Sequence, residues 1–227
     1  MPTIDWLKKE FHYGYESGDV LAPEPDPVRK EEEDKIGGSY RNVFYKGILP
    51  FIRPDSVVME LGPGKGSWSR PILDQIPYGK LYTVDFQDVT KWLQPEKYGG
   101  RLICVQVKDN SFSALPDGTF DFFWSMGVLC HQNVEHLQEI LTHSLQKMKL
   151  GGVAVHQYAD WEKLSAYGWD KGKIPKEFIT KPDDEIWWPR NSQKIMTMLA
   201  ERAGWTVLYS DLNLIQRDSM IVLKRMR

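Results

Sequence analysis

Three glycines follow a short apolar run near residue 60, and their spacing is the feature of this sequence best suited to binding a ligand. Gly62, Gly64 and Gly66 occupy alternating positions directly after residues 57–61. Glycine permits positive φ and lets a ligand lie against bare backbone, and the N–H groups that begin a following helix can hold a polar or anionic group. We expect that helix from Ser67 onward. The segment therefore predicts a ligand cradle between a strand and a helix.

Two acidic residues flank this cradle and narrow the ligand class. Asp85 ends a second apolar run, where a carboxylate can accept hydrogen bonds from both hydroxyls of a ribose. Glu60 immediately precedes the glycines, where its charge would repel a pyrophosphate but could hold an ammonium group, directly or through water. The loop and Asp85 together predict a nucleoside site, and Glu60 favours a cofactor with positive charge.

Two other nucleotide loops compare less well with this segment. A Walker loop requires Gly, four residues, Gly-Lys and then Ser or Thr, but Met59 replaces the first glycine and Gly66 follows the lysine. A dinucleotide loop requires Gly-x-Gly-x-x-Gly, and here Ser67 stands in the third place. The Walker class is excluded, and the dinucleotide class is disfavoured but stays open as an alternative.

Short, nearly continuous apolar runs alternate with helical stretches, as expected of a parallel sheet covered on both faces. The five predicted parallel strands are residues 57–61, 81–84, 102–105, 120–124 and 153–156. Apolar residues at spacings of three and four predict a helix over 134–148, which Gly151-Gly152 would end, and a second helix from Ser192 to about 203. Residues 205–212 and 219–224 are joined by too few residues for a parallel crossover and should form an antiparallel pair at one edge.

Composition limits the class of protein and its partners. The 227 residues suit one compact domain, and 29 Lys+Arg against 31 Asp+Glu give no basic footprint for a nucleic acid. No apolar run approaches the roughly 20 residues of a membrane span, and no signal-peptide core is present, so we expect a soluble cytoplasmic protein. Cys104 and Cys130 provide neither a disulfide framework nor metal-ligand spacing.

The ordered motifs resemble class I S-adenosylmethionine-dependent methyltransferases. Residues 60–66 are similar to the first motif of that family, and Asp85 matches its ribose acid. Asp109 and Asn110 resemble the motif that holds the adenine amino group, and residues 120–131, with Ser125, resemble the segment that passes the methionine moiety. Phe86 could cover the adenine face.

This resemblance covers residue 56 to the C-terminus and carries implications for fold and cofactor. It implies a Rossmann-like three-layer α/β sandwich with a seven-stranded, mostly parallel sheet of order 3-2-1-4-5-7-6, in which strand 7 is antiparallel. It also implies S-adenosylmethionine as cofactor and S-adenosylhomocysteine as product. We divide the chain into an N-terminal extension or lid, residues 1–50, and a methyltransferase domain, residues 51–227, with a substrate-lid insertion at about 158–190.

The predicted insertion is rich in tryptophan, at Trp161, Trp169, Trp187 and Trp188. It would close over the carboxyl ends of the strands, where ligands bind in open parallel sheets. Tryptophan stacks on the apolar faces of sugars and aromatic rings while its N–H bonds hydroxyls, so these four residues are predicted to bind a sugar or phenolic acceptor. The alternative is that the rings only anchor a long loop.

Methyl transfer needs a base only when the acceptor atom carries a proton. His131, after the fourth strand, and His156, at the end of the fifth, are the candidate bases. No metal is predicted, because Asp160, Asp183 and Asp184 lack ligand spacing.

Our interpretation is methyl transfer to a small-molecule hydroxyl, foremost a sugar or glycan precursor. N-methylation of an amine or protein side chain is the alternative within the class. A nicotinamide-dependent oxidoreductase and a non-catalytic cofactor-binding protein are the alternatives outside it. The sequence leaves the acceptor and the oligomeric state open.

Overall fold

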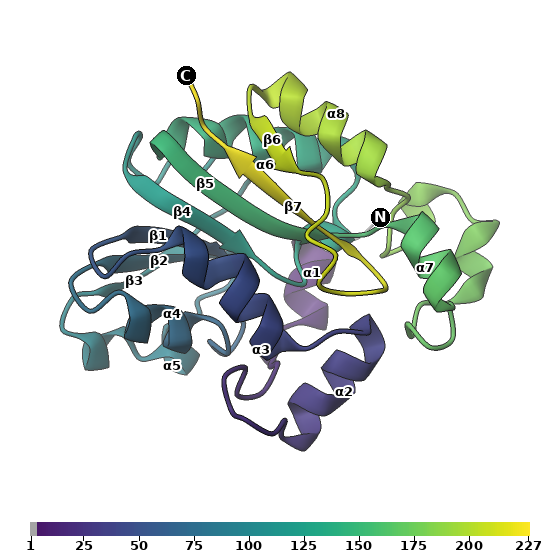
Figure 1. Cartoon of the computed structure of the whole chain (residues 1–227), viewed down its shortest axis with the longest axis horizontal. Coiled ribbons are helices and arrows are strands. Elements are labelled where there is room, and N and C mark those ends of the chain that lie inside the picture. The colour runs from purple at the N-terminus through teal and green to yellow at the C-terminus, as the bar shows by residue number, and fades with distance from the viewer. Residues whose placement is uncertain (1–3) are drawn as a thin grey trace.

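A single seven-stranded sheet organises the computed structural model, which describes residues 4–227 (Figure 1). The strands are β1 (Val57–Leu61), β2 (Lys80–Asp85), β3 (Leu102–Gln106), β4 (Phe120–Ser125), β5 (Met148–Tyr158), β6 (Thr206–Tyr209) and β7 (Ser219–Lys224). They lie in the order β3-β2-β1-β4-β5-β7-β6. The pairs that β7 makes with β5 and β6 are antiparallel, and the other pairs are parallel. The predicted order and the antiparallel edge pair are confirmed.

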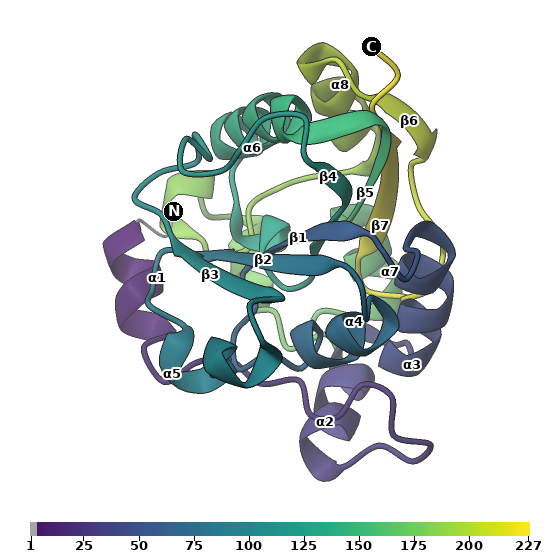
Figure 2. The ribbon, with the colours of Figure 1, turned by 90° about the vertical axis from the view of Figure 1, so that its left-hand side faces the viewer.

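Helices cover both faces of this sheet, which gives the predicted three layers. The α-helices are α1 (Ile4–Glu10), α2 (Pro27–Ile36), α3 (Tyr40–Val43), α4 (Ser69–Gln75), α5 (Thr90–Leu93), α6 (Val134–Lys147), α7 (Trp161–Tyr167) and α8 (Gln193–Ala203). Helices α6 and α8 lie on one face, and α3, α4 and α5 lie on the other (Figures 1 and 2). Shorter helical turns are Phe44–Ile48, Leu49–Phe51, Pro95–Tyr98, Leu129–His131, Lys176–Ile179 and Asp183–Glu185.

Local capping explains where the two long helices begin. The Asn133 side chain accepts a hydrogen bond from the His136 N–H at the start of α6, and the Ser192 side chain does the same for Ile195 in α8. The predicted end of the first helix is wrong. It stops at Lys147 because Met148 already has extended φ and ψ, and the Gly151-Gly152 pair lies inside β5.

The core has two halves, one on each side of the sheet, because successive strand residues point to opposite faces. Val58 belongs to the buried cluster that contains Ile72 of α4, whereas Met59 belongs to the cluster that contains Leu137 of α6. The sheet is thereby fixed between its helical layers, and the loops at its carboxyl edge are held in place.

Much of the N-terminal region belongs to this core. Val20, Ile36, Val43, Phe44 and Ile48 are buried in the cluster on the α4 side of the sheet. Residues 1–3 of the predicted extension lie outside the described residues. The part up to about residue 18 reaches across the carboxyl edge of the sheet, and we call residues 4–18 the N-terminal strap. Within the rest of residues 1–50, α2 adds Glu32, Lys35 and Ile36 to the same edge.

Within residues 4–227, no helix combines the length and the apolar character that crossing a bilayer requires.

Two substitutions in α2 test the placement of this region in the core. Ile36→Ala should lower the free energy of unfolding by about 2–5 kcal/mol, because Ile36 is buried and its loss leaves a cavity. Val28→Ala, on the exposed side of the same helix, should change it by less than about 0.5 kcal/mol. Urea unfolding measures both values, and equal effects would contradict the assignment.

Candidate active site

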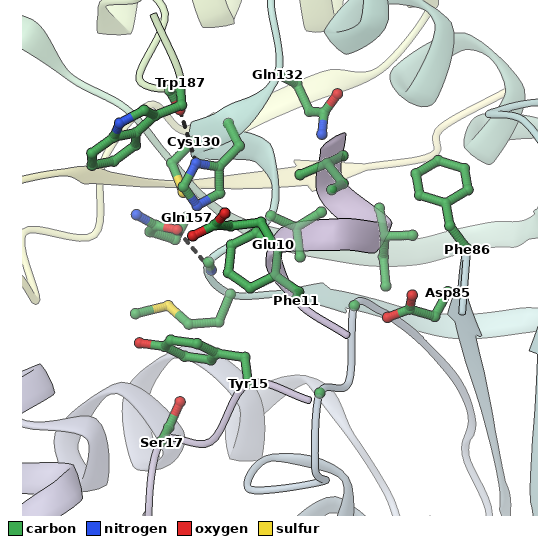
Figure 3. Close-up of a pocket in the computed structure, with 18 of the residues that line it drawn as sticks. Glu10, Phe11, Tyr15, Ser17, Asp85, Phe86, Cys130, Gln132, Gln157 and Trp187 are labelled. Carbon is green, nitrogen blue, oxygen red and sulfur yellow. Dashed lines mark hydrogen bonds between the residues drawn. The ribbon is translucent and has the colours of Figure 1, made fainter. Parts of the chain in front are cut away.

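A cavity of about 470 Å³ opens at the carboxyl ends of the parallel strands (Figure 3). One end is lined by residues of the glycine loop, the β2 turn and the loop after β3, namely Gly62, Gly64, Asp85, Phe86, Asp109 and Asn110. The other end is lined by His131, Gln157, Trp187, Trp188 and Arg217. We call these the donor end and the acceptor end. The structure thus brings together nine of the residues that the sequence predicted for the site.

The glycine loop adopts a backbone conformation that side chains would oppose. Gly62, Gly64 and Gly66 have φ of +69°, +54° and +85°. A Cβ at Gly62 would collide with the Val128 side chain, and one at Gly64 would collide with the carbonyl oxygen of Tyr15. Gly66 does not line the cavity, and a Cβ there would meet Leu93. All three glycines therefore shape the loop, but two of them form the cavity wall.

The turn after β2 presents a carboxylate to the donor end. Asp85 Oδ1 accepts a hydrogen bond from the Gln87 N–H at 2.9 Å, and Phe86 O accepts one from Gln106 Nε2 at 3.1 Å. Burial raises the pKa of Asp85 to about 6. A donor such as a ribose hydroxyl would favour the charged form of this carboxylate, so the turn has the chemistry predicted for it.

The loop after β3 lies beside the Asp85 turn and is tied to α6. Asp109 Oδ1 accepts from the Ser111 N–H at 2.9 Å. Hydrogen bonding by the Ser111 side chain, and then by this N–H, holds the pKa of Asp109 below its ordinary value. Asn110 Nδ2 donates to Glu139 at 3.2 Å. Phe112, which the sequence analysis did not select, is buried, has φ of +52° and also lines the cavity.

Three predicted site residues lie behind the cavity wall. Glu60 is 1% exposed and accepts a 2.5 Å hydrogen bond from Ser69 Oγ, so it joins β1 to α4 and does not line the cavity. Ser125 and His156 are both buried and share a hydrogen bond of 2.8 Å across β4 and β5. We therefore remove His156 from the candidate bases and Ser125 and Glu60 from the direct cofactor contacts.

His131 remains as the candidate base because it lines the acceptor end. Its Nδ1 lies 2.9 Å from the Trp187 carbonyl oxygen, which can only accept, so Nδ1 carries the proton and Nε2 has the lone pair. Desolvation among the surrounding rings lowers the pKa of His131 to about 4. The imidazole is therefore neutral at neutral pH and can accept a hydrogen bond through Nε2.

The four predicted substrate tryptophans divide into two pairs. Trp187 and Trp188 line the cavity, whereas Trp161 and Trp169 do not. Trp161 stands edge-on to Trp169 at 4.9 Å and donates from Nε1 to the Trp188 carbonyl oxygen at 3.3 Å. The first pair forms the acceptor wall, and the second supports the segment that carries it.

The sequence analysis predicted a lid within residues 1–50 but selected none of its residues for the site. Its residues Trp6, Glu10, Phe11 and Tyr15 line the cavity, and Phe11 lies between Asp85 on one side and Trp187 on the other (Figure 3). This segment contains no motif, and only its aromatic content could have signalled a role.

The comparisons with known proteins identify the family of the chain. A family model described as a methyltransferase domain matches residues 39–214. No curated protein matches the sequence.

Several solved structures share the fold at low sequence identity. An S-adenosylmethionine-dependent methyltransferase from Aquifex aeolicus has a TM-score of 0.61 and 18% identity, over 93% of this chain and 99% of that one. Geranyl diphosphate C-methyltransferase from Streptomyces coelicolor, in complex with Mg²⁺, geranyl diphosphate and S-adenosylhomocysteine, has a TM-score of 0.62 and 12% identity, over 91% and 88%. The pyocyanin biosynthetic protein PhzM has a TM-score of 0.60 and 17% identity, over 82% of this chain but only 56% of its own.

The chain belongs to the methyltransferase-domain family, because the family model covers more than half of it. It is a class I enzyme of this family with S-adenosylmethionine as its cofactor. The nicotinamide-dependent alternative is set aside by the same match.

The residues at the donor end fit this cofactor. Gly62 and Gly64 offer backbone without side chains to the cavity, and Asp85 offers carboxylate oxygens that suit a ribose diol. Among the described residues, no group of three His, Cys, Asp or Glu side chains is arranged to hold a metal ion.

Replacing the ribose acid tests the donor end. Asp85→Asn should weaken S-adenosylhomocysteine binding by about 1–3 kcal/mol, the value of hydrogen bonds to a charged group. In the wild type, affinity should fall as pH drops through about 6, because protonation of Asp85 removes acceptor capacity. Calorimetry between pH 5 and 8 measures both effects. Asp88→Asn, three residues along the same turn, is the control and should bind normally.

The buried Glu60 gives the apoprotein a pH-dependent stability. Burial raises the pKa of Glu60 from 4.5 to about 7, so its folded form holds a proton that the unfolded chain has lost. The contribution of Glu60 to stability should therefore fall as pH rises from about 4.5 to 7, with a slope of about one proton. Asp85 adds a smaller part of the same sign, whereas the buried His131 and His156, whose pKa values are lowered, add parts of the opposite sign. Urea unfolding of Glu60→Gln should lack this contribution, so the stability of the wild type relative to the variant should fall over this pH range. The exposed substitution Glu96→Gln should retain the contribution, and an unchanged slope in Glu60→Gln would refute the assignment.

Proposed function

We propose that this protein transfers a methyl group to a hydroxyl of a neutral small molecule, foremost a sugar or glycan precursor. The observation that carries the proposal is the neutral imidazole of His131 in the acceptor end, with Nδ1 bonded to the Trp187 carbonyl oxygen. Its Nε2 is an acceptor, and a hydroxyl is the group that needs one.

The proposed chemistry asks little of the protein beyond alignment and proton removal. S-adenosylmethionine, when bound, supplies an electrophilic methyl group on a sulfonium. A hydroxyl oxygen becomes strongly acidic as it bonds to carbon, so even a weak base such as His131 is sufficient for its proton. Trp187 fixes the ring and its tautomer, and the aromatic walls exclude water from the acceptor end.

The charges at the acceptor end support a neutral acceptor. Arg217 is ion-paired with Asp218 at 2.8 Å, and its guanidinium lies 4.5 Å from the centre of the Trp188 ring. Lys35 is ion-paired with Glu32 at 2.8 Å. Paired charges offer hydrogen bonds without a net charge, which suits a hydroxyl-rich molecule better than an ion.

An amine is the second candidate acceptor, because two glutamates and several aromatic rings line the same cavity. Glu10 and Glu32 lie on the lining, and aromatic faces attract cations. Against this candidate, Glu32 already accepts from the Tyr15 hydroxyl and pairs with Lys35, and one face of Trp188 is covered by Arg217.

We also propose that the N-terminal strap and the segment over residues 158–190 act as the two covers of the cavity. Phe11 and Tyr15 come from the first, and Trp187 and Trp188 from the second. Both cysteines are free thiols, which supports a reducing compartment such as the cytoplasm as the place of action.

A labelled-methyl assay tests the acceptor class and the base together. With neutral glycosides, phenols and amines as probes, we expect label in a hydroxyl compound, and His131→Asn should lower that turnover by about 10²- to 10⁴-fold while leaving S-adenosylhomocysteine binding intact. His136→Asn, on α6 and outside the cavity, is the matched control. Transfer to amines alone, or full turnover in His131→Asn, would refute the proposal.

A further inference from the structure

One side chain connects the ribose-binding turn to the N-terminal strap. The Gln87 backbone N–H donates to Asp85 Oδ1 at 2.9 Å, while its side-chain Nε2 donates to the Phe11 carbonyl oxygen at 3.0 Å. These residues are 76 positions apart in the sequence. A ligand that orders Asp85 therefore also orders the group that holds Phe11.

The same Phe11 contacts the proposed base. Its ring lies 6.0 Å from the His131 ring, centre to centre, at an interplanar angle of 52°. The other rings around His131 are Trp187 at 5.9 Å and Trp188 at 5.2 Å, both from the segment after β5. Phe11 is thus the aromatic neighbour that the strap adds to the surroundings of His131.

The strap has a second attachment on the glycine loop. The Lys65 N–H donates to the Tyr15 carbonyl oxygen at 2.7 Å, and the Ser17 N–H donates to Ser67 Oγ at 3.0 Å. Both partners belong to the loop that cradles the cofactor. The strap therefore bonds to both segments of the donor end and, through Phe11, reaches the acceptor end.

We propose that Gln87 and Phe11 are positioning residues that couple occupancy of the donor end to the placement of His131. The inference rests on the proposed function for the role of His131. Cofactor in contact with Asp85 and the glycine loop stabilises the turn and the loop, and with them the strap, which is bonded to both through Gln87 and Lys65. A stabilised strap keeps the Phe11 ring against His131, so a bound donor favours the enclosed position of the base.

Hydrogen exchange with S-adenosylhomocysteine as the probe tests the coupling without an acceptor. In the wild type, the ligand should slow exchange of the backbone amides in residues 5–17. In Gln87→Ala, which keeps the backbone bond to Asp85, this slowing should be reduced severalfold at saturating ligand, because one hydrogen bond to the strap is lost. Equal slowing in Gln87→Ala and wild type would overturn the proposal.

Gln106→Ala is the matched control. Gln106 donates a similar hydrogen bond, 3.1 Å, to the Phe86 carbonyl oxygen in the same turn, but it does not reach the strap. Its loss should leave the ligand-induced slowing intact. The same reduction in both variants would mean that the turn is merely loosened, and would overturn the role given to Gln87.

The His131 ring resonance provides the second readout, at one fixed pH. S-adenosylhomocysteine should shift this resonance in the wild type, and Phe11→Leu should remove most of the shift while retaining ligand binding. Tyr13→Leu, a neighbouring exposed aromatic in the strap, should keep it. An undiminished shift in Phe11→Leu would overturn the proposal. Because neither experiment uses an acceptor, their failure is distinct from the finding that His131 is not the base.

Discussion

Between β1 and α4 the main chain passes through three left-handed glycines, and the Tyr15 carbonyl oxygen occupies the space that a side chain at Gly64 would need. This close approach sets the geometry of the donor end. It brings Lys65 N–H against the strap and leaves bare backbone facing the cavity. The buried hydrogen bond from Ser69 to Glu60 fixes the two elements on either side of the loop. The absence of side chains at these glycines therefore allows both the exposed backbone at the donor end and the close packing of the strap against the loop.

Most of the fold could be predicted from local sequence patterns, namely apolar runs and the lengths of the links between them. Continuous apolar runs gave the parallel strands, and the short link before β7 gave its antiparallel direction. Strand ends were harder to predict. β5 continues to Tyr158, so His156 faces Ser125 in the core, and the next residue, Gln157, reaches the cavity instead. A shift of one residue exchanges the two faces of a strand, and composition does not determine that register.

The candidate site was predictable where a motif constrains the backbone and unpredictable where only tertiary packing does. Gly62, Gly64 and Asp85 lie on the cavity as expected. The sequence does not distinguish the tryptophans that line the cavity from those that support its wall, because both kinds are the same residue type in the same segment. Phe11 and Gln87 gain their importance from a contact that spans 76 positions, which no local pattern encodes.

The two ends of the cavity come from separate stretches of the chain. Gly62 to Gln87 form most of the donor end, whereas Trp187, Trp188 and Arg217 belong to later segments that pack as their own small cluster or precede β7. Mutation within residues 158–190 can therefore change the acceptor wall without altering the residues of the donor end. Loops on a rigid scaffold tolerate such changes. Here the contact between Phe11 of the strap and His131 of the acceptor end limits them.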